Sequence, residues 1–487
     1  MTRQRHALAR AGWLCLFLAL GVLYGLLLAW LSGSPRALHG LVFNDMAARL
    51  MAGRFDIDPA VIGAERFERD GRSFAYFGIL PAVLRMPLVG WLGLGGFDMT
   101  RQFKAFALAL GAAAQAAAVI VAFRPLGAST AAGLLKPPLV SAALLSGPPV
   151  MLAMRPSIFD ETAAWAWAFA SIFAALVLHG LTRSGGLRTS LLCLLALVAG
   201  LCLLTRPTTA LGLYLSLALL MLWLACSARN GVRPRPSELM RRLLSWQFLL
   251  PAAVASAFVL VAGGINVARW GNPFTVADLR AQVDMIAIFP DRLPRLEEYG
   301  LFNLGRLGYG LIYYFFPVWV LHWGSGLVLG ERILVLFDAF ELPPSSFLIS
   351  DPLTMALAAL GVVALARNRL AGVPRGGALA LVGGLCVAPA LMLTAWYMAF
   401  RYRLEFQPLF FTLACLGAAS WAARDPAGEG FVRSWRVRFV VGLWVLQIAS
   451  AHLHALAYVV SPFGPGHPHL SVSTPALNDR RIGFAGG

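Results

Sequence analysis

Three acidic residues stand where the chain enters or leaves strongly apolar segments. Asp45 follows the first apolar segment, whereas Asp160 and Glu161 follow Arg155 between two later ones. Ionisable groups at the depth of a membrane cost a few kcal/mol each unless they face a wet cavity or one another. A carboxylate at such a boundary can take a proton from an acceptor molecule, so we select Asp45, Asp160 and Glu161 as candidate catalytic residues.

Each of these acidic residues also has a purely structural interpretation. Asp160 and Glu161 lie at the expected start of a helix, where an N-cap and the helix dipole favour negative charge. Asp45 and Arg49 are four residues apart and could form a surface ion pair contributing a few tenths of a kcal/mol. One acidic residue is enough to cap the start of a helix. The presence of two beside Arg155 therefore leaves both the capping role and the catalytic role open.

A second group of residues could bind phosphate. Arg401, Tyr402 and Arg403 lie between two apolar segments, and the fork of an arginine matches phosphate oxygens. In the structural alternative, Arg403 forms an internal network with Glu405, and Tyr402 anchors the chain at the membrane interface. The candidate substrate-binding residues are Arg155, Arg280, Arg401, Tyr402 and Arg403, with Arg206 as a further possibility.

Metal ligands are not evident in the sequence. The histidines are isolated or close to the end of the last apolar segment, and no cluster has the spacing of a zinc or iron site. Asp56 and Asp58 could attract a divalent cation, although two carboxylates in a polar loop are usually just solvated. We therefore predict no metal centre, and a divalent cation stays an option.

The composition defines the broad class of the protein. Hydrophobic residues make up 59% of the chain, charged residues 13%, and the mean hydropathy is +0.72. Soluble domains are about 45 to 50% apolar and about 25% charged. The net charge of +17 comes from arginines in short clusters between apolar segments, as in membrane proteins. We expect a polytopic membrane protein surrounded by lipid, and we exclude nucleic acid as a partner, since no soluble basic domain is present.

Apolar segments of about twenty residues predict an all-α fold with about 11 transmembrane helices, and about 13 if two irregular segments also span the membrane. The predicted spans are 11–31, 102–123, 134–153, 160–180, 189–205, 208–226, 246–268, 352–366, 377–397, 405–423 and 438–460. We expect one membrane domain over residues 1–460 and a flexible tail over 461–487.

Arginine clusters predict the orientation of these spans. Applied to the loops, the positive-inside rule puts the N-terminus in the cytoplasm of a multi-pass protein of the inner (plasma) membrane. The segments then predicted to share the outer face are 32–101, 155–160, 206–207, 269–351 and 398–404. Two apolar segments, 74–97 and 308–329, disturb this alternation, so we interpret both as interfacial or re-entrant pieces on the outer side.

A short amphipathic helix is predicted in the first outer loop. Phe43, Met46 and Leu50 recur at helical spacing, as expected for a helix over 43–52 that lies on the membrane. Asp45 then lies off the apolar stripe, on the watery side. Gly53 ends the helix.

The first half of the chain resembles the GT-C superfamily of integral-membrane glycosyltransferases. The resemblance comprises an N-terminal span, an outer-loop helix from Asp45 to Gly53, and an aromatic-Gly-x-x-Pro segment with Tyr76, Gly78 and Pro81. It is similar to the group that contains the protein O-mannosyltransferases and the aminoarabinose transferases of lipid A. The resemblance covers residues 1–230, a glycosyltransferase-like N-terminal module. The Trp-Trp-Asp signature of oligosaccharyltransferases is missing.

This resemblance implies a function and a role for each acidic residue. In those families an acidic residue of the first outer loop is the catalytic base or lies beside it, which matches Asp45. A second acidic residue follows the third span, which matches Asp160 or Glu161 and implies that it orients the acceptor or the sugar. We therefore expect inverting transfer of a sugar from a polyprenyl-phosphate donor to a cell-envelope acceptor.

Two other classes of protein remain open from the sequence. A transporter or lipid flippase would also use ionisable residues within the membrane, but such proteins usually contain two matching halves, and no repeat is visible here. The other class is a non-catalytic membrane protein of envelope assembly that keeps the fold.

Overall fold

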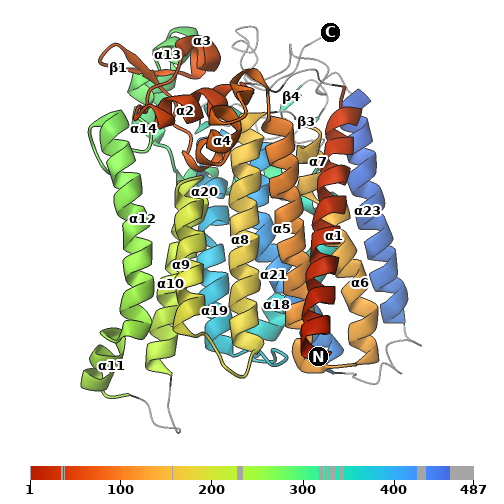
Figure 1. The fold of residues 1–487 in the computed structure, drawn as a ribbon. Coiled ribbons are helices and arrows are strands. Elements are labelled where there is room, and N and C mark those ends of the chain that lie inside the picture. Colours follow the sequence, from red (N-terminus) through yellow and green to blue (C-terminus); the bar gives the residue numbers. More distant parts are fainter. Residues whose placement is uncertain are drawn as a thin grey trace.

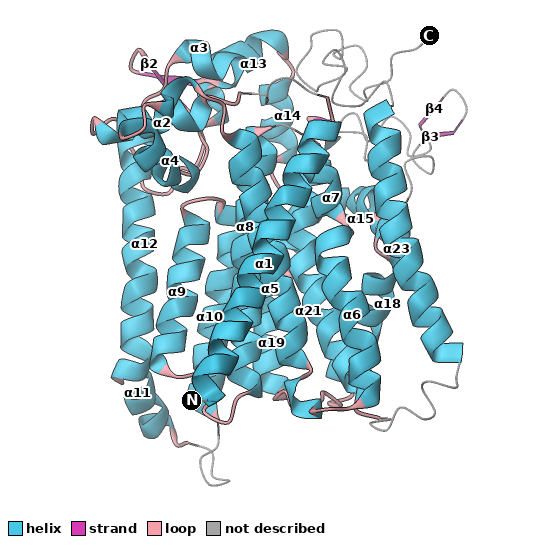
Figure 2. Cartoon of the chain, turned by 45° about the vertical axis from the view of Figure 1, so that its right-hand side comes forward, coloured by secondary structure: helices cyan, strands magenta, loops and turns pink. Residues whose placement is uncertain are grey.

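The fold is a bundle of long helices that run side by side (Figures 1 and 2). The computed structural model describes residues 2–33, 37, 39–155, 157–227, 234–316, 322–323, 326–327, 336–340, 345–424 and 435–460. The single long helices in these ranges are α1 (Thr2–Leu31), α5 (Thr100–Ala122), α8 (Ile158–Thr182), α9 (Thr189–Leu203), α10 (Pro207–Cys226), α12 (Trp246–Trp270), α18 (Pro352–Ala366), α21 (Arg403–Ala422) and α23 (Trp435–Val460). Two interrupted helices complete the bundle, α6 (Thr130–Leu145) with α7 (Pro148–Ala153), and α19 (Arg375–Leu385) with α20 (Val387–Thr394).

Each predicted apolar span coincides with one of these helices or helix pairs. In the described residues, six helices are long and apolar enough to cross a membrane: Thr100–Leu126, Ile158–Thr182, Pro207–Cys226, Trp246–Trp270, Arg375–Thr394 and Trp435–Val460. The all-helical membrane class is therefore confirmed, whereas the count of about eleven spans stays a prediction. The expected tail over 461–487 lies outside the described residues.

Shorter elements gather at one end of the bundle, which we call the loop-rich end (Figure 1, top). They include α2 (Val42–Met51), α3 (Pro59–Ile62), η1 (Gly63–Glu65), α4 (Leu80–Gly90), η2 (Leu94–Gly96), η4 (Leu279–Ala281), α13 (Val283–Ile288), α14 (Arg292–Tyr299), η5 (Leu304–Arg306), α15 (Leu307–Phe315), α17 (Phe347–Ser350) and η7 (Phe400–Tyr402). Helix α11 (Pro236–Leu243) lies at the opposite end of the bundle, which is also the end where α1 begins (Figure 1). A short turn, η3 (Arg124–Leu126), follows α5.

Hydrogen bonds connect the distant segments of the loop-rich end. The amide of Leu80 donates to the carbonyl of Leu204 at 3.0 Å, and Arg269 donates to the carbonyl of Phe77 at 2.8 Å. The predicted outer segment 32–101 therefore contacts the turn that precedes 206–207 and the start of segment 269–351 at this end.

Strands occur only in connecting segments of the described chain. An antiparallel pair joins β1 (Phe67–Arg69) to β2 (Arg72–Phe74), and a second joins β3 (His322–Trp323) to β4 (Gly326–Leu327). The parallel pair β5 (Ala339–Phe340) and β6 (Tyr397–Met398) links the long second outer segment to the turn before α21.

The amphipathic helix of the first loop forms as predicted. Phe43, Met46 and Ala47 on α2 are buried, and Gly53 follows the helix with a positive φ of 72°. The apolar stripe packs into one cluster with Phe77 and Ile158. Protein rather than lipid therefore covers this face, which corrects the expectation that the helix lies on the membrane.

The two irregular apolar segments contain only short helices in the described chain. Helix α4 has 11 residues and is about 16 Å long, well below the roughly 30 Å of a bilayer core. Helix α15 has nine residues, and much of 317–329 lies outside the described residues. Neither helix can span a membrane, as the interfacial interpretation requires.

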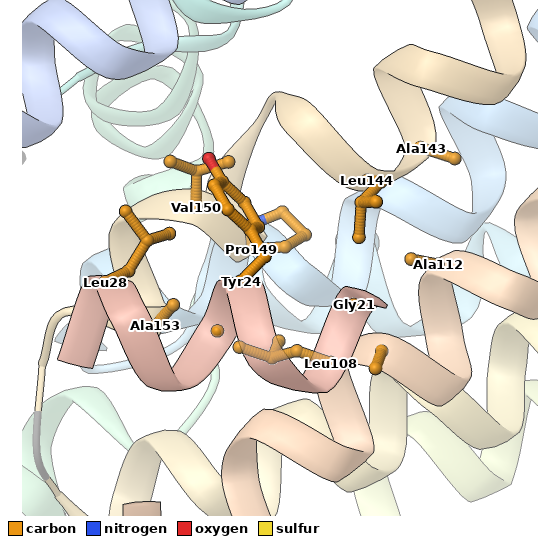
Figure 3. A pocket seen from close by; sticks show the side chains of 12 residues that line it. Gly21, Tyr24, Leu28, Leu108, Ala112, Ala143, Leu144, Pro149, Val150 and Ala153 are labelled. Atoms are coloured by element: carbon orange, nitrogen blue, oxygen red, sulfur yellow. The ribbon is translucent and has the colours of Figure 1, made fainter. Parts of the chain in front are cut away.

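An apolar crevice lies between α1, α5, α6 and α7 (Figure 3). It has about 280 Å³ of empty space, part of it open to the surroundings. The phenol of Tyr24 beside it bonds to His452 of α23 at 2.5 Å. Since no charged side chain lines it, the crevice cannot perform the predicted acid–base chemistry.

Candidate active site

The first turn of α8 holds the acidic pair at the loop-rich end. Ser157 caps this helix, because its hydroxyl accepts a hydrogen bond from the amide of Phe159 at 3.2 Å. Asp160 and Glu161 follow in the first turn, and both are fully buried. Consecutive helical residues point in different directions, so the two carboxylates have different partners.

Glu161 forms a buried ion pair with Arg85 of α4. The two guanidinium nitrogens lie 2.8 and 2.7 Å from the two carboxylate oxygens, and neither side chain is exposed. The Arg85 guanidinium also lies over the rings of Phe43 and Phe103. This bidentate pair neutralises Glu161 and connects the first loop to α8, which favours a structural role.

Asp160 faces a different cation, Arg155. Arg155 Nε lies 3.5 Å from Asp160 Oδ2, and the arginine side chain stays 13% exposed while that of the aspartate is fully buried. Lys104 of α5 supports the preceding turn, because its ammonium group donates to the carbonyls of Leu152 and Arg155. The looser geometry places a carboxylate and a partly accessible cation together at the helix start.

Arg401 lies among aromatic rings beside this helix start. Its guanidinium carbon is 5.0 Å from the ring centre of Phe159, 5.3 Å from that of Tyr397 and 5.2 Å from that of Tyr402. Aromatic faces stabilise a guanidinium group without neutralising its charge. Arg401 is therefore held next to Phe159, the residue that precedes Asp160.

Arg206, the residue before α10, also contacts the Tyr402 ring. Its guanidinium carbon lies 5.0 Å from the ring centre of Tyr402, and it pairs with Glu405 at 2.6 Å. Thr208 and Thr209 donate to the second oxygen of Glu405. Two guanidinium groups from distant parts of the chain thus share the Tyr402 ring.

Asp45 has its partners within its own loop. Its Oδ2 accepts a hydrogen bond from Arg49 at 2.9 Å and another from the amide of Asp58 at 2.8 Å. Arg49 and Arg54 both pair with Asp56. Burial raises the pKa of Asp56, but the hydrogen bond from Arg54 and the charges of both arginines outweigh it and hold that pKa below its usual range. Asp45 thus belongs to a network of carboxylates and arginines within its loop.

Arg403 and Arg280 lie in other surroundings. Arg403 is fully buried and donates to Ser345 at 2.6 Å and to Asp351 at 3.1 Å, so the predicted network between Arg403 and Glu405 is wrong. Residues two apart on a helix do not face each other, which explains why the two side chains have different partners. Arg280 is 70% exposed and pairs with Glu297 at 3.3 Å.

Glu65 and Tyr76 join the site without having been selected from the sequence. The ring centre of Tyr76 lies 4.5 Å from that of Phe77, and that of Phe77 lies 5.3 Å from that of Phe159, the ring beside Arg401. No local pattern marks Glu65, because its neighbours in space come from the second outer segment. Among the described residues, no group of three or more His, Cys, Asp or Glu side chains could hold a metal ion.

This helical bundle shares its fold with solved structures of archaeal oligosaccharyltransferases. It is similar to the apo crystal structure of the oligosaccharyltransferase of Archaeoglobus fulgidus, with a TM-score of 0.53 and 14% identity over 93% of this chain and 56% of that one. It is also similar to the archaeal oligosaccharyltransferase AglB from Archaeoglobus fulgidus in complex with an inhibitory peptide and a dolichol-phosphate. That match has a TM-score of 0.51 and 14% identity over 94% of this chain and 57% of that one.

The likeness is one of fold. The chain spans little more than half the length of these archaeal enzymes. No family model matches the chain, and neither does any curated protein sequence. The resemblance predicted from residues 1–230 therefore extends to nearly the whole chain as a shared architecture.

Proposed function

We propose that the protein is a membrane glycosyltransferase that moves a sugar from a polyprenyl-phosphate donor to a cell-envelope acceptor. The observation that carries this proposal is the group formed by Asp160, Arg155 and Arg401 at the loop-rich end of a GT-C bundle. Carboxylate and guanidinium groups are the residue types that this reaction needs at a lipid–water boundary. The complex of AglB with a dolichol-phosphate supports a lipid phosphate as a ligand of this fold.

In this proposal the arginines stabilise the leaving group. When the bond between the anomeric carbon and the phosphate oxygen breaks, negative charge grows on the lipid phosphate. Arg401 and Arg206, supported by the Tyr402 ring, are positioned to bind that phosphate. Asp160, oriented by Arg155, would hold a hydroxyl group of the sugar. A single displacement inverts the anomeric centre.

The acceptor must lose a proton to a second carboxylate. The candidate predicted from the sequence is Asp45, in the first outer loop. The proposed orientation puts the loop-rich end outside the inner membrane and the N-terminus in the cytoplasm. Asp56, which together with Asp58 could attract a divalent cation, is already paired with Arg49 and Arg54, and our mechanism routes no step through a metal ion.

The test is transfer from labelled polyprenyl-phosphate sugars by purified wild-type protein, with envelope membranes as the acceptor source. The wild type is expected to release labelled product, and Asp160→Asn is expected to lose at least about 100-fold of that rate with an unchanged melting temperature. A wild type that transfers none of these sugars but moves a solute across vesicles would favour the transporter instead.

A further inference from the structure

Glu65 belongs to the first loop, but its hydrogen bond joins it to Gln282 of a distant segment and not to the Asp45 network. It ends η1, is half-buried, and its Oε2 accepts a hydrogen bond from Gln282 at 2.9 Å. Gln282 is 2% exposed and accepts in turn from Arg292 at 2.9 Å. The Glu65 carboxylate is thus fixed through Oε2 by a neutral amide rather than by a cation.

The surroundings of Glu65 are those of the candidate active site. Arg292, which donates to Gln282, has its guanidinium carbon 5.2 Å from the ring centre of Trp396. The next residue, Tyr397, is one of the rings that hold Arg401. Burial raises the pKa of Glu65 above its ordinary range, although these arginines and Gln282 oppose the shift. A raised pKa makes a carboxylate a stronger base near neutral pH.

Asp45 has the opposite environment. An arginine of its own helix and a backbone amide both bond to its Oδ2. The Asp45 carboxylate is thus already paired with a cation, whereas the hydrogen bond to Glu65 comes from a neutral amide. Of these two carboxylates in the first loop, Glu65 combines an anchored oxygen with proximity to Arg401.

We propose that Glu65, rather than Asp45, is the carboxylate that takes the proton from the acceptor. The assignment rests on the proposed function and deepens it. The acceptor oxygen or nitrogen forms a bond to the anomeric carbon while the bond from that carbon to the phosphate oxygen breaks. The electron pair of the broken bond leaves with the lipid phosphate, and the acceptor proton moves to Glu65 Oε1, from which water later removes it.

The experiment measures transfer from the labelled polyprenyl-phosphate sugar that the wild type uses, together with binding of unlabelled polyprenyl phosphate. Glu65→Gln keeps an acceptor oxygen for Gln282 but cannot take a proton. We expect it to lower kcat at least about 100-fold and to leave the Kd for polyprenyl phosphate within about twofold. Glu68→Gln is the matched control, because Glu68 is an exposed residue of the same loop that pairs with Arg66. The activity of this variant is expected to stay close to that of the wild type.

Glu65→Asp separates the chemical role from a structural one. This variant keeps a carboxylate, so it is expected to retain more activity than Glu65→Gln at a comparable melting temperature. Equal losses in the two variants, or a folded Glu65→Gln within about fivefold of wild type, would overturn the assignment. A wild type that transfers no sugar would instead overturn the proposed function on which the assignment rests.

Discussion

Two acidic regions of the loop-rich end differ in how their charges are balanced. In the Asp45 network, Arg49 bonds to Asp45 and Asp56, and the side chains of Asp45 and Arg49 are each 21% exposed. At the start of α8, Asp160 is fully buried and faces Arg155 at 3.5 Å, with Arg401 on aromatic rings nearby. The half-buried Asp45 network balances its charges within its own loop, whereas the second region brings together charged groups from distant parts of the chain. The comparison teaches that sequence position alone does not identify the reactive carboxylate.

The ion pair between Arg85 and Glu161 gives the largest expected effect on stability. Arg85→Ala would leave Glu161 buried without its bidentate partner, which costs about 3 to 5 kcal/mol. Arg49→Ala breaks half-buried ion pairs with Asp45 and Asp56 and should cost less than Arg85→Ala, on the order of 1 kcal/mol. Thermal unfolding of both variants in detergent checks this order, and equal melting temperatures would show that the buried pair does not connect α4 to α8.

Removal of the shared aromatic ring should weaken ligand binding without disrupting the bundle. Tyr402→Leu deletes the face on which Arg206 and Arg401 rest. Each of the two lost cation–π contacts costs about 0.5 to 1 kcal/mol, so the Kd for polyprenyl phosphate should rise about fivefold to thirtyfold. Titration of the purified variant measures this change. Tyr299→Leu, at the end of α14, serves as the control, and an equal rise in both variants would remove the specific role of Tyr402.

The Asp45 network gives the smallest effect, and its dependence on pH has a definite sign. Because the pKa of Asp56 is lowered in the folded protein, its contribution to stability is present above the ordinary carboxyl pKa of about 3.9. The contribution is lost as the pH falls through the lower folded value. Asp56→Asn should therefore melt a few degrees below wild type at neutral pH, and the gap should close in acid. A gap that widens in acid would contradict the lowered pKa.

Local patterns in the sequence predicted much of this structure. The apolar spans coincide with helices because about twenty apolar residues suffice to define a membrane helix. The stripe of Phe43, Met46 and Leu50 predicted α2, since helical periodicity is a local property. The arginine clusters, together with the alternation of the apolar spans, predicted that five connecting segments share one face. In the described residues these segments meet at the loop-rich end.

Contacts between distant segments could not be predicted in this way. Glu405 pairs with Arg206, which is 199 residues away, rather than with nearby Arg403. Arg85 stands within the apolar segment 74–97, and its partner Glu161 lies 76 residues further on. Glu65 carries no local signal because Gln282, which fixes its carboxylate, belongs to another loop. A single sequence shows which residue types are available for this site, but it does not show which of them pair with one another.

Binding of polyprenyl phosphate by two arginine variants tests the central claim most directly. Arg401→Gln removes a cation of the candidate active site, and Arg49→Gln removes one from the Asp45 network at the same end of the molecule. We predict that Arg401→Gln raises the Kd at least about tenfold and that Arg49→Gln leaves it within about twofold. An unchanged Kd in Arg401→Gln, together with a large rise in Arg49→Gln, would contradict the claim and move the site to the Asp45 network.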